Sequence, residues 1–181
     1  MIKYSLEEAK RVWLISDTHF DHTNIIRYCD RPFKSAEEMN EVLLQNWISI
    51  VASDDTVYFL GDMVFGRGSR NPRWWVTQLS GKIIWIKGSH DHGVRPSSMI
   101  SNVERVVLSE VISCGGIEFM LVHDTFDTVV NGWQGWIIHG HNHGNQPHIH
   151  LVRRRVNVSV EVIDYKPISL AHIVEEVGYG A

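Results

Sequence analysis

Five short apolar segments recur along the chain, and each is followed by glycine or polar residues. They cover residues 12–16, 56–60, 82–87, 117–122 and 136–138. Short apolar runs with these boundaries are typical of strands that are buried on both faces. We therefore predict that these five segments form the central strands of an α/β fold.

A different spacing marks the helices. Apolar residues at helical intervals predict an amphipathic helix over residues 35–52. These residues are Met39, Val42, Leu43, Trp47 and Ile50. Ser35 and Glu38 have the spacing of a capping box at the start of this helix. Shorter helices are predicted over residues 72–79 and 168–177.

The remaining segments predict further strands and one long loop. Residues 105–112 and 117–122 are expected to pair as a hairpin around Gly115-Gly116. Residues 156–162 alternate apolar and polar positions, which predicts a strand with one face in water. The connection after residue 87 runs for about 15 residues, longer than most connections, and is a candidate functional loop. We expect two packed sheets, or one large mixed sheet, with helices outside.

Composition narrows the class of protein. The chain has 181 residues, 44% of them apolar and 21% charged, which suits one globular domain over residues 1–181. The formal net charge of -4 provides no general attraction to nucleic acid or to an anionic membrane. Nucleic acid stays open as a partner without being indicated. No apolar run approaches the length of about 18 residues that a membrane span needs, so no membrane association is expected.

The cysteine content predicts the compartment. With only Cys29 and Cys114 present, a disulfide framework is not expected. The first residues also lack the apolar core of a secretory signal. Both observations predict a reduced, cytoplasmic setting.

Side chains of the kinds that bind metal ions follow each of the five predicted strands. They are Asp17 and His19, Asp62, Ser89-His90-Asp91, His123, and His141 and His143. The carboxyl ends of strands in an open α/β sheet form the crevice where ligands bind. Five separate loops therefore deliver these side chains to one edge. In an extended segment, Asp17 and His19 would share a face, and so would His141 and His143.

These residue types predict a particular chemistry. Carboxylate and imidazole ligands suit Mn, Fe, Zn, Ni or Mg. A carboxylate that ends a strand, such as Asp62, can bridge two cations with its two oxygens. Cations held about 3.5–4 Å apart can bind a phosphate and position a hydroxide for in-line displacement. Asp-x-His and Gly-Asp are weak signals alone, and Gly140-His141-x-His143 is more specific. All five motifs in order predict a metal-dependent hydrolase.

The order of the motifs resembles the calcineurin-like metallophosphoesterase superfamily. The resemblance is carried by Asp17-x-His19, Gly61-Asp62, Gly88-x-His90-Asp91, His123 and Gly140-His141-x-His143. Residues 15–20, 24–29, 156–162 and 164–167 resemble a small bacterial and phage branch, so that nearly the whole chain is covered. The resemblance implies an α/β fold of the four-layer type, a sandwich of two mixed β-sheets flanked by helices.

The resemblance also implies a role for each motif residue. Two divalent cations are expected, with Mn as the first choice. The implied ligands are Asp17, His19 and His143 for the first cation, His123 and His141 for the second, and Asp62 as the bridge. His90 would contact the substrate phosphate or protonate the leaving group, and Asp91 would orient His90.

One position departs from the family pattern. Where the family has Asn, this chain has Ser89, which is shorter and a weaker neutral ligand. We expect the second cation site to be looser for this reason. The departure leaves open a protein of another class, one that binds metal or phosphate with weakened catalysis.

The expected substrate is a phosphoester. The small size of the chain favours an open site and a nucleotide-like phosphodiester, and a phosphomonoester stays open. His22, Asn24 and Arg27 are candidate substrate contacts, on a segment that also carries Arg31. The alternative for this segment is a solvated helix start. The sequence does not determine the oligomeric state.

Overall fold

The computed structural model describes residues 1–94, 102–126 and 130–178. Within these residues the chain forms two mixed β-sheets, of six and five strands, and four α-helices. The expected fold class, an α/β sandwich of two mixed sheets with flanking helices, is confirmed. Residues 95–101, about half of the long loop predicted after residue 87, lie outside the described residues.

The five-stranded sheet has the order β11-β2-β3-β4-β5. Its strands are β2 (Val12–Ile15), β3 (Thr56–Phe59), β4 (Lys82–Ile86), β5 (Val103–Val107) and β11 (Ile168–Ser169). The strands β2 to β5 are parallel, and β11 runs antiparallel to β2. Nearly every residue of β3 and β4 is buried, as the short apolar runs predicted.

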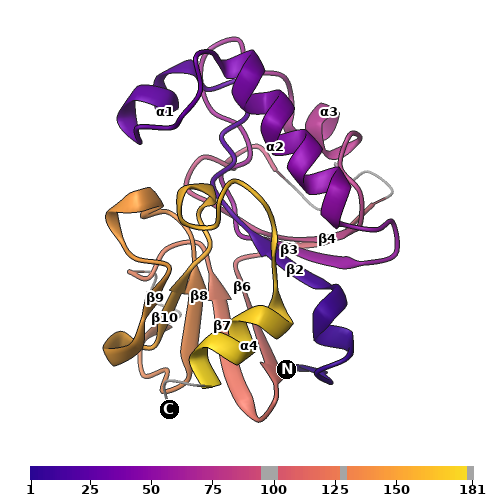
Figure 1. The fold of residues 1–181 in the computed structure, drawn as a ribbon, viewed down its shortest axis with the longest axis vertical. Helices are drawn as coiled ribbons and strands as arrows, with labels where there is room; N and C mark the ends of the chain where they lie inside the picture. Colours follow the sequence, from indigo (N-terminus) through magenta and orange to yellow (C-terminus); the bar gives the residue numbers. More distant parts are fainter. Residues whose placement is uncertain (95–101, 127–129, 179–181) are drawn as a thin grey trace.

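Three helices lie next to this sheet, above it in the view of Figure 1. They are α1 (Thr23–Tyr28), α2 (Ala36–Ile50) and α3 (Pro72–Val76). Ser35 caps α2 by accepting a hydrogen bond from the Glu38 backbone N–H at 3.2 Å, as predicted. Trp47 of α2 is fully buried, with its ring 6.4 Å from that of Phe59 in β3. The helix is therefore held by the apolar face that its sequence presents.

The six-stranded sheet has the order β1-β6-β7-β8-β10-β9. Its strands are β1 (Ile2–Tyr4), β6 (Ser109–Cys114), β7 (Ile117–Val122), β8 (Trp136–His139), β9 (Ile149–His150) and β10 (Arg155–Asn157). The hairpin around Gly115-Gly116 is confirmed as β6 and β7. The single strand expected over residues 105–112 is wrong, because residues 103–107 pair with β4 in the other sheet. The chain passes from one sheet to the other at the exposed Leu108.

The end of the chain differs from the prediction in two places. The strand expected over 156–162 ends at Asn157 and is followed by a 3-10 helix, Val160–Val162. Asn157 and Ser159 are fully buried, so these polar positions do not face water. Their side chains turn inward to form hydrogen bonds. The polar positions of the alternating pattern are therefore residues that form buried hydrogen bonds with other loops.

The last helix, α4 (Leu170–Gly178), starts two residues later than predicted. Residues Ile168–Ser169 pair with β2 instead. The helix packs against β2, β6, β11 and a 3-10 helix, Glu8–Arg11. None of the helices in the described part of the chain combines the length and the apolar character that crossing a bilayer requires.

Candidate metal centre

The loops that follow β2, β3, β7 and β8 bring six of the predicted ligands together in two groups. The first group is Asp17, His19 and His143, and the second group is Asp62, His123 and His141. In each group, one nitrogen or oxygen atom per residue lies within 4.8 Å of the others. Loops from both sheets therefore contribute to each group.

The backbone at these residues is not extended. Asp17, His19, Asp62, His141 and His143 all have φ between +48° and +67°. This left-handed conformation is uncommon outside glycine and collects at functional sites. The expectation of extended segments with paired faces is therefore wrong. Asp17 and His19 still converge, whereas His141 and His143 point into different groups.

The two oxygens of Asp17 have different surroundings. Oδ2 accepts hydrogen bonds from the Ser16 hydroxyl, from the Ser159 hydroxyl at 3.0 Å and from the His141 backbone N–H at 2.9 Å. Oδ1 is buried with no hydrogen-bond partner in the described structure. It lies 4.0 Å from His19 Nε2 and 3.9 Å from His143 Nε2. One oxygen fixes the carboxylate, and the other faces the two imidazoles.

The two carboxylate oxygens of Asp62 also have different surroundings. Its Oδ1 accepts the His90 backbone N–H at 2.8 Å. Its Oδ2 lies 3.3 Å from His123 Nε2 and 3.8 Å from His19 Nε2, so this oxygen stands between the two groups. The carboxylate packs against Gly88, where an added Cβ would overlap it. Glycine at position 88 is therefore required by the close approach.

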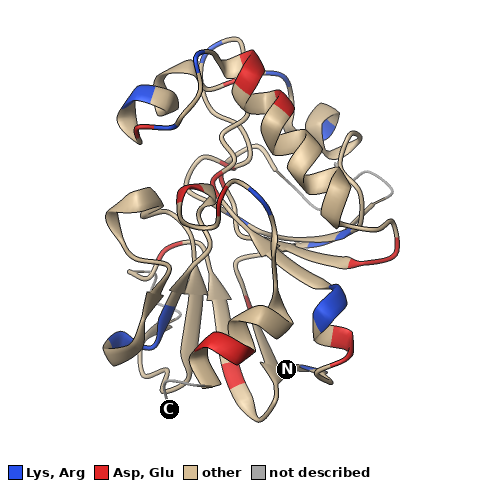
Figure 2. Ribbon diagram, viewed as in Figure 1, with Lys and Arg blue, Asp and Glu red and all other residues tan. Residues whose placement is uncertain are grey.

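Opposite charges shape the protonation of this cluster. Burial lowers the pKa of His123, but its bond to Asp62 and the charges of Asp17 and Asp62 raise it, with a net pKa of about 9. Burial likewise lowers the pKa of His143, but hydrogen bonds and nearby carboxylates raise it to about 10. Burial keeps the pKa of His19 well below its usual value. Figure 2 shows acidic segments where the two sheets meet. Carboxylates that hold protons on imidazoles in this way would also hold a divalent cation.

The donor atoms fit divalent cations. Asp17 Oδ1 and both ring nitrogens of His19 are buried without a hydrogen-bond partner in the described structure. Buried polar atoms normally have a partner, and an ion is one explanation for those that lack one. A set of carboxylate oxygens and imidazole nitrogens suits Mn, Fe, Zn, Ni or Mg. We conclude that the first and second groups are suited to hold such cations.

Ser89 and His90 lie at the open side of the cluster. The Ser89 hydroxyl donates to Asp62 Oδ2 at 3.0 Å. The side chain of His90 is 35% exposed, with Nε2 3.9 Å from the same oxygen. The ring centroid of Phe65 is 4.0 Å from that of His90. His90 is thus accessible to a substrate while its ring is held on one side.

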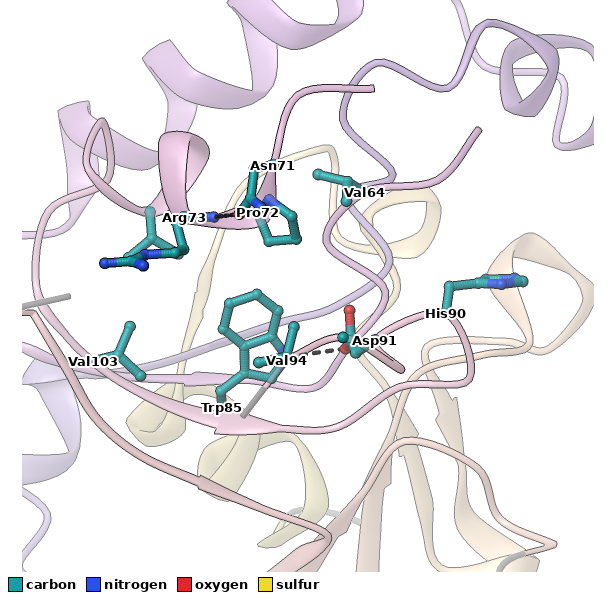
Figure 3. A pocket seen from close by; sticks show the side chains of 11 residues that line it. Val64, Asn71, Pro72, Arg73, Trp85, His90, Asp91, Val94 and Val103 are labelled. Atoms are coloured by element: carbon teal, nitrogen blue, oxygen red, sulfur yellow. Dashed lines mark hydrogen bonds between the residues drawn. The ribbon is translucent and has the colours of Figure 1, made fainter. Parts of the chain in front are cut away.

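The surroundings of Asp91 differ from the prediction. The Asp91 carboxylate is buried and accepts hydrogen bonds from the backbone N–H groups of Asp62, Met63 and Gly88 and from the Trp85 indole. None of these bonds reaches His90. Figure 3 shows the His90 ring directed away from the cavity that Trp85 and Asp91 line. Burial raises the pKa of Asp91 despite these donors. Asp91 organises the loops around Asp62 rather than the ring of His90.

The three candidate substrate contacts lie in different surroundings in the structure. His22 is buried beside the first group, with its ring 5.4 Å from that of His19 and 4.8 Å from that of Phe65. Asn24 and Arg27 are exposed on α1, as a solvated helix start would be. Arg27 stacks on its neighbour Tyr28, 5.4 Å from the ring centroid.

The sequence reasoning missed several residues that support the cluster. Glu161 accepts a hydrogen bond from His143 Nδ1, Ser159 donates to Asp17, and Trp85 donates to Asp91. Arg31, expected either as a phosphate contact or in solvent, is buried behind the Asp17 loop. These residues belong to none of the five metal-ligand motifs, and only their inward-facing polar groups distinguish them. Contacts of this kind depend on packing between distant segments.

Similar proteins are known in an archaeon, a phage and a bacterium. The chain is 42% identical over 176 residues to an uncharacterised protein of Methanocaldococcus jannaschii, covering 94% of this chain and 93% of that protein. It is 26% identical to the Gene 66 protein of Mycobacterium phage L5, over 82% and 86% of the two chains. The crystal structure of an Aquifex aeolicus protein of unknown function matches 91% of this chain and 98% of its own, with a TM-score of 0.71 and 27% identity.

A protein-family comparison covers most of the chain. Residues 10–167 match the family described as calcineurin-like phosphoesterase. This range includes every residue of the first and second groups. The chain therefore belongs to the calcineurin-like phosphoesterase family, a family of metal-dependent phosphoric ester hydrolases.

Proposed function

We propose that this protein is a phosphodiesterase with a binuclear metal centre. Asp17, His19 and His143 would hold one divalent cation, and His123 and His141 would hold the other. The observation that carries the proposal is the place of Asp62 Oδ2, within 4 Å of a nitrogen from each group. A carboxylate in this position can bridge two cations.

The bound cations would polarise the phosphate oxygens and activate a water for in-line attack. The protein itself supplies the alignment. Donors to Asp17 Oδ2 and Asp62 Oδ1 leave the other oxygen of each carboxylate directed into the cluster. Mn is our first choice of metal, and Fe, Zn, Ni and Mg suit the same ligands.

His90 is the proposed general acid. Its side chain is partly exposed, and Nε2 lies close to Asp62 Oδ2 at the open side of the cluster. From this place it can donate a proton to the leaving oxygen of an ester whose phosphate is bound at the cluster. Phe65, whose ring is tilted by 44° against the imidazole, limits the orientations of the ring.

The exposure of the second group favours a diester. The side chain of His141 is 40% exposed, and that of His90 35%. The outer part of the cluster is therefore open, and the second organic group of a diester, such as a nucleotide, has room to extend into solvent. His22, beside the first group, is the proposed phosphate contact, with Asn24 and Arg27 further out on α1.

Ser89 favours a second candidate function. Its hydroxyl is already bonded to Asp62 Oδ2, the oxygen that the second cation would need. Weak occupancy of the second position would leave a protein that binds one metal and phosphate but hydrolyses esters slowly. A phosphomonoester substrate is the further alternative within the same fold.

Hydrolysis of bis(p-nitrophenyl) phosphate with added Mn²⁺, compared with p-nitrophenyl phosphate, tests the proposal. We expect turnover that is greater on the diester and falls to background in Asp62→Asn. Asp55→Asn is the matched control. Asp55 is also a buried carboxylate, but it lies at the opposite end of β3, bonded to Arg11 and Trp13.

Turnover in the control should persist. Full activity in Asp62→Asn would contradict the bridging role. Absence of turnover on both esters by the natural chain would favour the weakened metal-binding protein.

A further inference from the structure

Glu161 is a buried carboxylate directly behind the candidate ligand His143. Its side chain is 5% exposed, and Oε1 accepts a hydrogen bond from His143 Nδ1 at 2.9 Å. With Nδ1 engaged, Nε2 is the nitrogen that remains to face Asp17 Oδ1, 3.9 Å away. A ligand imidazole that donates its other N–H to a carboxylate is fixed in orientation and made more basic.

Arg31 completes this arrangement. Its side chain is fully buried, and it donates to Glu161 Oε1 from Nε at 2.9 Å and from a terminal nitrogen at 2.7 Å. The guanidinium also donates to the backbone carbonyls of Asp17 at 2.7 Å and Thr18 at 2.9 Å. One side chain therefore joins the loop after β2, in one sheet, to the segment after β10, in the other.

The charges explain why both residues are needed. A buried carboxylate without a partner is strongly unfavourable, and Arg31 supplies the opposite charge. The pair in turn holds the loop after β2 by the backbone carbonyls of Asp17 and Thr18, so the two loops that carry Asp17 and His143 are set relative to each other.

We propose that Glu161 and Arg31 are positioning residues for the first cation, acting through His143 and the Asp17 loop. The inference rests on the proposed function for the existence of that cation. Glu161 acts as the acceptor that directs His143 Nε2 toward Asp17, and Arg31 keeps Glu161 in place.

A double-mutant cycle on metal affinity tests this inference. Zn²⁺ binding is measured by titration calorimetry in a His141→Ala background, in which the first group is the intact one. Glu161→Ala should weaken binding by roughly 10- to 100-fold, the usual effect of losing such a partner. When His143→Ala is also present, Glu161→Ala should add less than about a twofold change, because residues acting through one contact are not additive.

The opposite results would overturn the inference. An undiminished effect of Glu161→Ala beside His143→Ala would mean that Glu161 acts elsewhere. An unchanged Zn²⁺ affinity in Glu161→Ala alone would mean that it does not act at all. If Glu161→Ala fails to fold, the pair Arg31→Met and Glu161→Ala removes both buried charges. This double variant should fold and should still bind Zn²⁺ weakly. A Zn²⁺ affinity equal to that of the natural chain would also overturn the inference.

A spectroscopic readout and a control separate positioning from general stability. In the Zn²⁺-loaded natural chain, the ¹⁵N shifts of His143 should show a protonated Nδ1 and a coordinated Nε2. Glu161→Gln, which keeps an oxygen acceptor, should preserve this pattern. Glu110→Ala is the matched control, because Arg105 holds Glu110 with the same two-nitrogen geometry, at 3.1 and 2.7 Å, on β6.

Natural affinity in the Glu110→Ala control is expected, and an equal loss there would overturn the inference. Hydrolysis enters none of these measurements. If the double-mutant cycle gives the expected Zn²⁺ affinities but the natural chain hydrolyses no ester, only the proposed function is contradicted. A natural chain that binds no Zn²⁺ would overturn both.

Discussion

The backbone N–H of His141 donates a hydrogen bond to Asp17 Oδ2 at 2.9 Å, although the two residues are 124 positions apart. Asp17 follows β2 in the five-stranded sheet, and His141 follows β8 in the six-stranded sheet. The bond aligns the ends of the two sheets. It also leaves Asp17 Oδ1 directed at His19 and His143.

Gly140→Ala should damage the first group. An added Cβ would overlap Asp17 Oδ2 and the Ser16 hydroxyl, so the Asp17 carboxylate must move. We expect Zn²⁺ affinity to fall and the free energy of unfolding to drop by about 1–3 kcal/mol, as for other overpacked sites. Calorimetric titration and urea unfolding measure the two effects.

Gly144→Ala is the control, because the nearest atom to its added Cβ is Glu161 Cβ at 3.8 Å, an ordinary contact. Equal losses in the two variants would contradict the steric explanation.

Trp85→Phe should weaken the support of Asp62. The Trp85 indole donates to Asp91 Oδ2 at 2.9 Å, and Asp91 in turn accepts the Asp62 backbone N–H. Loss of a donor to a buried carboxylate costs about 1.5–3 kcal/mol, against about 0.5–1.5 kcal/mol for a neutral acceptor. Urea unfolding should therefore show a greater loss in Trp85→Phe than in Trp47→Phe, whose indole donates to the Ser80 carbonyl.

The two tryptophan variants should also differ in function. Only Trp85→Phe should lower Mn²⁺ affinity, because Trp47 lies away from the cluster, on α2. A lowered metal affinity in Trp47→Phe alone would count against this assignment.

Ser89→Asn should tighten binding at the second group. The longer amide side chain offers a carbonyl oxygen, whereas the Ser89 hydroxyl is bonded to Asp62 Oδ2. We expect the weaker of two Mn²⁺ dissociation constants to fall about tenfold, which corresponds to about 1.4 kcal/mol. Mn²⁺ titration followed by electron paramagnetic resonance measures this, and identical constants in the two chains would refute it.

Divalent metal should stabilise the fold. Asp17 Oδ1 and the His19 nitrogens are buried without hydrogen-bond partners in the described residues, and a bound cation would supply them. At a concentration of 100 times the dissociation constant, a bound ligand adds about 2.7 kcal/mol to the free energy of unfolding. For a chain of this size, that is a rise in Tm of roughly 5–11 °C.

Calorimetric scans with Mn²⁺ and with a chelator would show this difference. The rise should shrink in Asp62→Asn. A Tm that does not respond to Mn²⁺, Zn²⁺ or chelator in the natural chain would contradict metal binding at this site.

Local pattern alone predicted most of the framework. The buried strands β2, β3, β4, β7 and β8 follow from short apolar runs, and α2 follows from its 3.6-residue spacing and its Ser35 cap. The candidate ligands lie directly after these strands, so the sequence also predicted which side chains meet. Periodicity and motif order are properties of neighbouring residues, which is why they can be read without a structure.

The tertiary structure decided the rest. It turned Asp91 toward Trp85, and it placed Arg31 and Glu161, 130 positions apart, in one buried pair. The polar positions at Asn157 and Ser159 are buried for the same reason. A hydrogen bond between distant segments depends on how two sheets pack and on left-handed turns at single residues. Neither is encoded in local spacing, because the bond requires two segments that are distant in the sequence to lie side by side.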